Sequence, residues 1–293
     1  MTNLDRSPLS VRLATLGPMA VVLLALTVLP ILNLVVASFQ EVRWSGGTRV
    51  ATWRGFDNYA QMASDQLLHA GLVNTAIFVA VATAAQVTLG LALAVLCHGV
   101  GRTSRPFRTI IILPILIPGI IIGAIWKLMY NYQFGIINQL LEWLGVERLD
   151  WLGSPELALL SVIIVDVWHW TPFSFLLLLA ALESLPSDVY EAARIDGASG
   201  WQTFTNITLP LLMPAIFVTV AFRAMTAIKV FDEIFLLTGG GPGTSTEVLS
   251  FTIYQRFFIE DNIGYGSAIS VSVIFATALI LTVALSVRRE TGR

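Results

Sequence analysis

Long runs of apolar residues constrain this chain more than any other feature. A run of about 20 mainly apolar residues is long enough to cross the hydrocarbon core of a bilayer, and a helix satisfies its own backbone hydrogen bonds there. We predict six such helices and therefore an all-α integral membrane fold. The predicted spans are Leu16–Phe39, Leu72–Leu96, Thr109–Met129, Leu157–Leu179, Leu209–Ile228 and Ala268–Val287.

The composition supports placement in lipid and excludes several classes of function. Charged residues make up only 12% of the chain, whereas about a quarter is usual for a soluble domain. The net charge of −2 gives no electrostatic basis for binding nucleic acid. One cysteine, Cys97, cannot form an internal disulfide, and the three scattered histidines do not supply a zinc site. We therefore expect no metal site.

The charges in the loops predict an orientation. An even number of spans places both termini on the same side, and that side also carries the cluster of Arg102, Arg105 and Arg108. Basic residues that flank spans stay in the cytoplasm. We therefore expect a cytoplasmic N-terminal segment (residues 1–15), a transmembrane domain (residues 16–287) and a cytoplasmic tail (residues 288–293).

One cytoplasmic loop, at about residues 184–208 between the fourth and fifth spans, is more acidic than its neighbours. We predict that Ser187 caps a helix there, because Asp188 and Glu191 then lie where the helix dipole favours negative charge. Gly197 would allow a sharp turn after this helix. An amphipathic helix on the lipid headgroups is one interpretation. The acidic polar face instead favours a protein partner, because helices that lie on anionic lipid are usually basic.

The residues of this loop carry a specific resemblance. Glu191-Ala192-Ala193, Gly197 and Ile207-x-Leu209-Pro210 have the spacing of the coupling loop in permease subunits of binding-protein-dependent ATP-binding-cassette importers. In that family the loop forms two short helices that dock on the ATPase subunit. The resemblance therefore assigns ATPase coupling to one set of residues: Glu191, Ala192, Ala193, Asp196, Gly197 and Ala198.

Other motifs extend the resemblance over most of the chain and favour the carbohydrate branch. They are Gly55-Phe56-Asp57-Asn58-Tyr59, Asn74-Thr75, Leu113-Pro114 through Pro118, Gly135-x-x-Asn138, Thr238-Gly239-Gly240-Gly241-Pro242 and Gly264-Tyr265-Gly266. The third-span exit and the Thr-Gly-Gly-Gly-Pro segment resemble the first of two paired permeases, of the maltose or glycerol-phosphate type.

This resemblance implies a bacterial-type inner membrane, a multi-pass chain and a set of partners. The partners are a second permease, two copies of a cytoplasmic ATPase, a periplasmic or lipid-anchored solute-binding protein, a sugar-like substrate and membrane lipid. The chain itself would hold no cofactor, since ATP-Mg would bind the ATPase subunits.

Ionisable groups at membrane depth usually line a pathway or pair with one another, and Asp166, Arg223 and Lys229 lie at such positions. Aromatic residues of the fourth span could stack on sugar rings. Aligned with the maltose transporter, the substrate contacts would fall at His169, Trp170, Phe173, Arg223, Ala227 and Val230.

Other interpretations of this region stay open. Trp168 and Trp170 could form an interfacial aromatic belt, and His169 could be a packing residue. A related pattern has Asp where this chain has Thr226. The loss of a carboxylate near Arg223 would favour an anionic sugar.

Two further function classes compete with an importer. Asp166 and His169 lie three residues apart on one helical face and could be the acid/base pair of a membrane enzyme. No nucleophile or phosphate-binding loop accompanies them, because Gly239–Gly243 lacks the Lys-Ser/Thr ending of a P-loop. We therefore expect no catalytic residue. An ion-driven carrier or channel is the other alternative, but it does not need an acidic docking loop.

Overall fold

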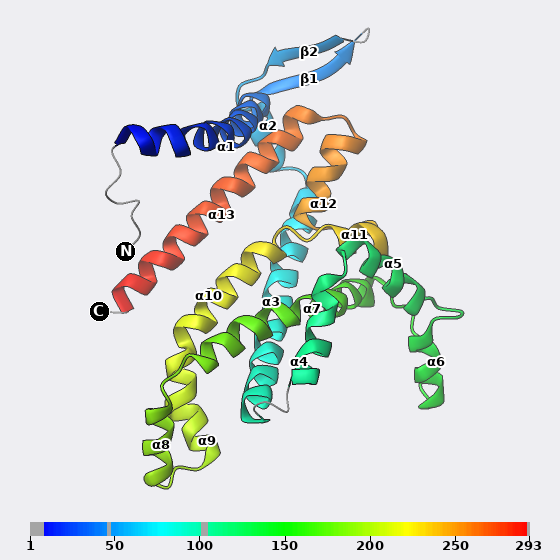
Figure 1. The fold of residues 1–293 in the computed structure, drawn as a ribbon. Coiled ribbons are helices and arrows are strands. Elements are labelled where there is room, and N and C mark those ends of the chain that lie inside the picture. Colours follow the sequence, from blue (N-terminus) through cyan, green and yellow to red (C-terminus); the bar gives the residue numbers. More distant parts are fainter. Residues whose placement is uncertain (1–8, 46–47, 101–104, 292–293) are drawn as a thin grey trace. The chain divides into compact units, whose positions relative to one another are not determined.

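The computed structural model describes residues 9–45, 48–100 and 105–291, so Arg102 of the predicted arginine cluster lies outside the described residues. Internal contacts divide the chain into two units. We call residues 1–65 with 253–293 the terminal unit, and residues 66–252 the central unit (Figure 1). Five described helices are long and apolar enough to cross a membrane, and one bent helix pair raises this number to six.

The terminal unit joins two long helices with a small sheet. Its elements are α1 (Leu9–Ser38), β1 (Gln40–Ser45), β2 (Thr48–Trp53), α2 (Asp57–Met62), the π-helical turn Gln255–Ile259 and α13 (Ile263–Thr291). The strands form an antiparallel hairpin with Gln40 opposite Trp53. The all-α prediction is therefore incomplete. The hairpin sequence alternates polar residues with Val42, Trp44 and Val50, which suits a pleated ribbon.

Two glycine-containing motifs meet at Gln40 in the terminal unit. Asn58 donates hydrogen bonds to the carbonyl oxygens of Ser38 (2.8 Å) and Gln40 (3.0 Å), so it ties α2 to the end of α1. Gly264 approaches the same Gln40 so closely that a β-carbon would lie 1.9 Å from its carbonyl oxygen. Tyr265 then donates a 2.7 Å hydrogen bond to Asp65. The motifs around Asn58 and Gly264 therefore form one joint.

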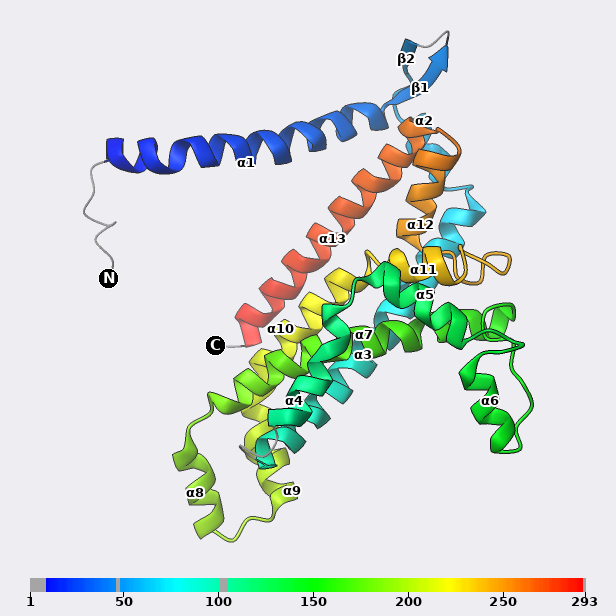
Figure 2. The ribbon, with the colours of Figure 1, turned by 45° about the vertical axis from the view of Figure 1, so that its right-hand side comes forward.

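The central unit contains ten α-helices and two short helical turns in its described part. They are α3 (Gln66–Val100), α4 (Arg105–Ile112), the 3₁₀ turn Leu113–Leu116, α5 (Gly119–Met129), α6 (Ile136–Trp143), α7 (Pro155–Glu183), α8 (Ser187–Ile195), α9 (Gly200–Thr203), the π-helical turn Phe204–Thr208, α10 (Leu209–Ala227), α11 (Asp232–Leu237) and α12 (Leu249–Tyr254), whose last two residues belong to the terminal unit. Figures 1 and 2 both show α8 and α9 at one end of this unit and α5 and α11 at the other.

Helices α3, α7 and α10 pack against one another and form the core of the central unit. The buried core side chains are Val87, Ala94, Cys97, Phe175, Leu178, Leu179, Leu182 and Leu212. Gly90 lies at the contact of α3 with α7, where a β-carbon would approach the backbone nitrogen of Phe175 to 2.8 Å. Small residues allow such close approach between helices in lipid.

The third predicted span is broken rather than straight. The segments Arg105–Leu116 and Gly119–Met129 meet at an angle of 97°. Pro114 lies in the 3₁₀ turn, and Pro118 precedes the first residue of α5. Since proline removes a backbone donor and disfavours helix in the residue before it, these two positions account for the break.

Asn138 organises the short α6 segment. Its amide donates to the carbonyl oxygen of Leu149 (3.0 Å) and accepts hydrogen bonds from the Leu149 backbone and the Trp151 indole. Arg148 pairs with Glu142 at 2.6 Å, and this hydrogen bond holds the pKa of Glu142 below its usual value. The Gly-x-x-Asn motif is therefore a structural hub.

Candidate functional site

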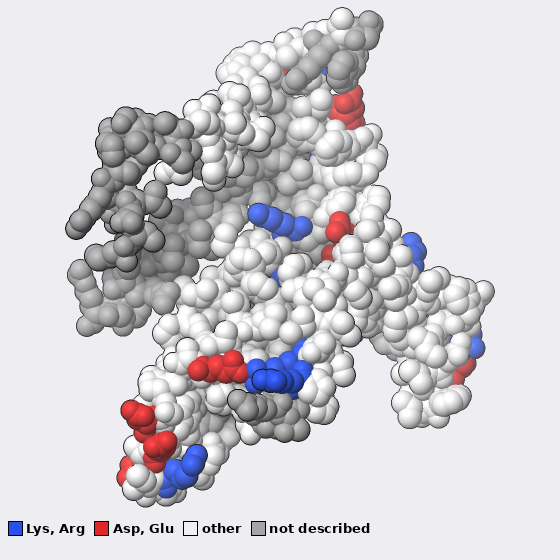
Figure 3. Space-filling model, viewed as in Figure 1, with Lys and Arg blue, Asp and Glu red and all other residues white. Residues whose placement is uncertain are grey.

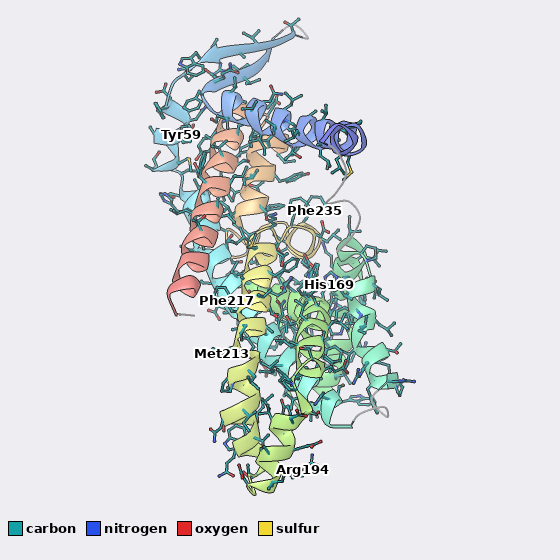
Figure 4. All side chains as sticks on the ribbon, turned by 60° about the vertical axis from the view of Figure 1, so that its left-hand side comes forward. Tyr59, His169, Arg194, Met213, Phe217 and Phe235 are labelled. Carbon is teal, nitrogen blue, oxygen red and sulfur yellow. The ribbon has the colours of Figure 1, made fainter. Side chains whose placement is uncertain are left out.

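A polar cavity of about 210 Å³ lies within the central unit, where α7, α10 and α11 converge. It contains six of the eight predicted pathway residues. Its lining residues are Gly119, Asp166, His169, Trp170, Arg223, Thr226, Lys229, Val230, Phe231, Asp232 and Glu233. Figure 4 shows His169 among the packed helices of this unit. A larger cavity of about 650 Å³, between α3, α4, α5 and α7, is lined almost wholly by apolar side chains.

A buried network holds Arg223, the largest fully buried side chain of the described residues. Its Nη2 donates to Asp166 Oδ2 at 3.3 Å, and its Nε donates to Gln86 Oε1 at 2.7 Å. Gln86 in turn donates to Asp166 Oδ2 at 2.6 Å. Arg223 also donates to Thr226 Oγ1 at 2.8 Å. A buried charge needs such complete pairing, because an unpaired one is expensive in a low-dielectric interior.

This pairing bears on the interpretation of Thr226. Arg223 has a carboxylate partner, but Asp166 of α7 supplies it rather than a residue of α10. The absence of Asp at position 226 therefore leaves no uncompensated guanidinium.

His169 and Glu233 form a second buried pair. His169 Nδ1 lies 3.1 Å from Glu233 Oε1, and both side chains are almost fully buried. Asp166 and His169, weighed as an acid/base pair from their spacing, therefore have different partners. The ring of His169 is also 5.0 Å from that of Trp170.

Two predicted pathway residues lie outside the cavity lining. Phe173 stacks on Phe222 of α10 with ring centroids 4.7 Å apart, and Ala227 is buried. Gln86 and Glu233 were not among the predicted pathway residues. A glutamine inside a predicted span is a detectable signal, since its amide must find partners in lipid. Glu233 lies five residues beyond the predicted end of the fifth span, so hydropathy does not mark it as a residue at membrane depth.

The predicted coupling loop forms two helices with a sharp turn between them. Helix α8 spans Ser187–Ile195, and Gly197 follows in the left-handed region at φ +73°. The Ser187 capping prediction is wrong, since Pro186 occupies the cap position and Ser187 is already helical. A capping box instead begins α9: Ser199 and Gln202 exchange hydrogen bonds between side chain and backbone.

The two faces of α8 differ. Ala193 is buried, whereas Glu191, Ala192 and Ile195 are exposed, and the exposed fraction of Ile195 reaches 86%. Figure 4 shows Arg194 at the end of the central unit, and Figure 3 shows charged side chains gathered at this end. The exposed part of α8 therefore mixes acidic, basic and apolar side chains.

A polar contact joins α8 to the base of α10. The Tyr190 hydroxyl lies 3.2 Å from Thr208 Oγ1, and Thr208 immediately precedes α10. From Leu209, this helix runs without interruption to Arg223. At 1.5 Å per residue this distance is about 21 Å. One continuous helix, with Pro214 inside it, thus extends from the two-helix loop to the polar cavity.

Comparisons with known proteins agree on the family. The family described as "Binding-protein-dependent transport system inner membrane component" matches residues 86–289. The trehalose/maltose transport system permease protein MalF of Thermococcus litoralis is 37% identical, covering 97% of this chain and 96% of that protein. The sulfoquinovosyl glycerol transport system permease protein SmoG of Agrobacterium fabrum is 35% identical, covering 91% and 86%.

A solved structure shares the fold. The bacterial ABC transporter "involved in the import of the acidic polysaccharide alginate" contains a chain with a TM-score of 0.85 and 25% identity, covering 97% of this chain and 96% of that one. The predicted spans, the two-helix loop and these comparisons lead to one assignment. The chain belongs to the inner membrane components of binding-protein-dependent transport systems, the permease subunits of ABC importers.

Proposed function

We propose that this permease serves an ATP-driven importer for a sugar, a sugar derivative or a polyol. The names of the relatives support a carbohydrate, since one is a trehalose/maltose permease and another a sulfoquinovosyl glycerol permease. The polar cavity supports it as well. It combines the aromatic face of Trp170 with hydrogen-bonding groups of His169 and Glu233, and small-molecule sites usually join apolar walls to a few placed polar groups.

The complete importer contains this chain, a second permease, two copies of an ATPase and a solute-binding protein outside the membrane. The ATPase subunits bind ATP-Mg, and this chain carries no catalytic residue. Both termini lie in the cytoplasm, on the same side as α8 and α9. The exposed acidic and apolar face of α8 supports a protein partner at this end.

Coupling follows from the geometry of the loop. ATPase closure displaces α8, and the Tyr190–Thr208 contact together with the turn at Gly197 passes the displacement to α10. Because α10 is one continuous helix, its far end moves Arg223 and Thr226 in the cavity wall. The single observation that carries this proposal is the continuous path from the exposed α8 surface to the polar cavity.

Replacing Gly197 tests the proposal. Gly197→Val forces a β-branched residue into the left-handed region, a strain of about 1–3 kcal/mol, and should re-aim α8 against α9. We expect ATP-dependent uptake by the reconstituted transporter to fall to background while the chain still inserts.

Gly145→Val is the matched control. Gly145 has nearly the same φ, +76°, and as at Gly197 a β-carbon would meet no atom within 4 Å, but it lies outside the coupling loop. This variant should retain uptake. Normal transport by Gly197→Val with the ATPase bound, or solute transport without any ATPase, would contradict the proposal.

A further inference from the structure

We infer that the polar cavity selects a neutral, hydroxyl-rich solute and disfavours an anionic sugar. This inference rests on the proposed function, since it assumes that solute passes through this cavity. The two named relatives described above do not decide the charge: trehalose and maltose are neutral, whereas sulfoquinovosyl glycerol carries a sulfonate. The charges of the cavity wall decide it instead.

Arg223 is not available to bind an anion. Only 1% of the residue is exposed, and its guanidinium already donates to Gln86, Thr226 and Asp166. Its Cζ lies 4.7 Å from the centroid of the Trp170 ring, a cation–π distance. Arg223 is therefore a positioning residue that fixes the Trp170 wall.

The formal charges of the side chains that line the cavity do not add up to a positive value. Three acidic side chains line the cavity, Asp166, Asp232 and Glu233, against two basic ones, Arg223 and Lys229. The formal sum is −1, and protonation of His169 would raise it only to zero. An entering anion therefore meets a wall without excess positive charge, and like charges are strongly unfavourable in a low-dielectric site.

The lining of the polar cavity suits a neutral polyol. Carboxylate oxygens accept hydrogen bonds from hydroxyl groups, and such charge-assisted bonds are shorter and stronger than neutral ones. The buried Glu233 carboxylate, held by His169 on one oxygen, lines the cavity together with the aromatic ring of Trp170. A hydroxyl-bearing ring thus finds both hydrogen-bond acceptors and an aromatic side chain among the lining residues.

Direct binding to the assembled transporter tests this inference without the selectivity of the solute-binding protein. The purified complex of both permeases and the ATPase is examined by saturation-transfer NMR. The neutral probes are maltose, trehalose and sucrose, and the anionic probes are digalacturonate and sulfoquinovosyl glycerol. We expect at least one neutral sugar to bind and no anionic sugar to displace it.

A charge-only variant sharpens the test. Glu233→Gln keeps the side-chain size and removes one negative charge, so it should weaken neutral-sugar binding by about tenfold, the effect of one lost charge-assisted hydrogen bond. It should also improve binding of the anionic probes. Glu156→Gln makes the same change at an exposed α7 position outside the cavity and should alter neither.

The outcomes separate the inference from the proposed function. Anionic sugars that bind as tightly as every neutral probe would overturn the inference and leave the sugar importer standing. Failure of every sugar to bind the complex or to be transported by it would overturn both. An unchanged preference in Glu233→Gln would also refute the charge argument.

Discussion

At the scale of single residues, the sequence identifies the buried charges of the central unit but not how they pair. Hydropathy alone marks Asp166 and Arg223 as unusual, because ionisable groups inside spans are costly. Nothing in the sequence says that they pair, since 57 positions separate them. Gln86, a further 80 positions from Asp166, completes the network. Only the packing of α3, α7 and α10 brings the three side chains together.

Asp166→Asn tests how much this network contributes to the stability of the fold. The substitution leaves the Arg223 guanidinium buried without a charged partner, which should destabilise the fold by about 3–5 kcal/mol. Thermal unfolding of the purified transporter in detergent measures the loss.

The double variant Asp166→Asn with Arg223→Gln serves as the control. It removes both charges, so it should recover most of the stability lost in the single variant. A single variant as stable as the unmodified chain would show that the pair contributes nothing.

At the scale of elements, predictions succeeded where a local rule dictates the outcome. Apolar length located the spans, and Gly197 turns the chain after α8 as expected. Features that neighbouring segments decide were not predicted. The hairpin at Gln40–Trp53 depends on pairing between two short segments. The angle of 97° near Pro114 and Pro118 depends on how the two helical segments pack on their neighbours.

The crossing of α3 with α7 yields a prediction at this scale. In Gly90→Ala the new β-carbon would lie 2.7 Å from Ser174 Cβ and 2.8 Å from a backbone nitrogen, so the helices must separate. We expect a loss of about 1–3 kcal/mol, the usual range for overpacking. Thermal unfolding of the purified transporter measures it.

Gly99→Ala provides the comparison within the same helix. A β-carbon at Gly99 meets no atom within 4 Å, and alanine favours helix over glycine. Its melting temperature should be unchanged or slightly higher. Equal losses at both positions would show that Gly90 is not a packing contact.

At the scale of the whole molecule, the orientation in the membrane is open to a direct measurement. The chain has one cysteine, Cys97, which is buried, so Cys97→Ala gives a clean background for labelling. In that background, Asp196→Cys should react with a membrane-impermeant maleimide only from the cytoplasm, and Glu147→Cys only from the outside. Both native side chains are exposed.

The reverse labelling pattern would place the two-helix loop outside the cell. Coupling to a cytoplasmic ATPase through α8 would then be excluded. Labelling of both positions from one side would show an error in the number of crossings between them, since only α7 lies between Glu147 and the loop.

The sequence by itself determined that this chain belongs in a membrane, where its long helices run and where the two-helix loop lies. These features follow from local rules: apolar length, glycine at a positive φ and a short motif with fixed spacing. The tertiary structure alone decided which buried charges neutralise one another, and so the character of the cavity. Coulombic pairing depends on distance in space, and residues as far apart as Gln86 and Arg223 meet only after their helices pack.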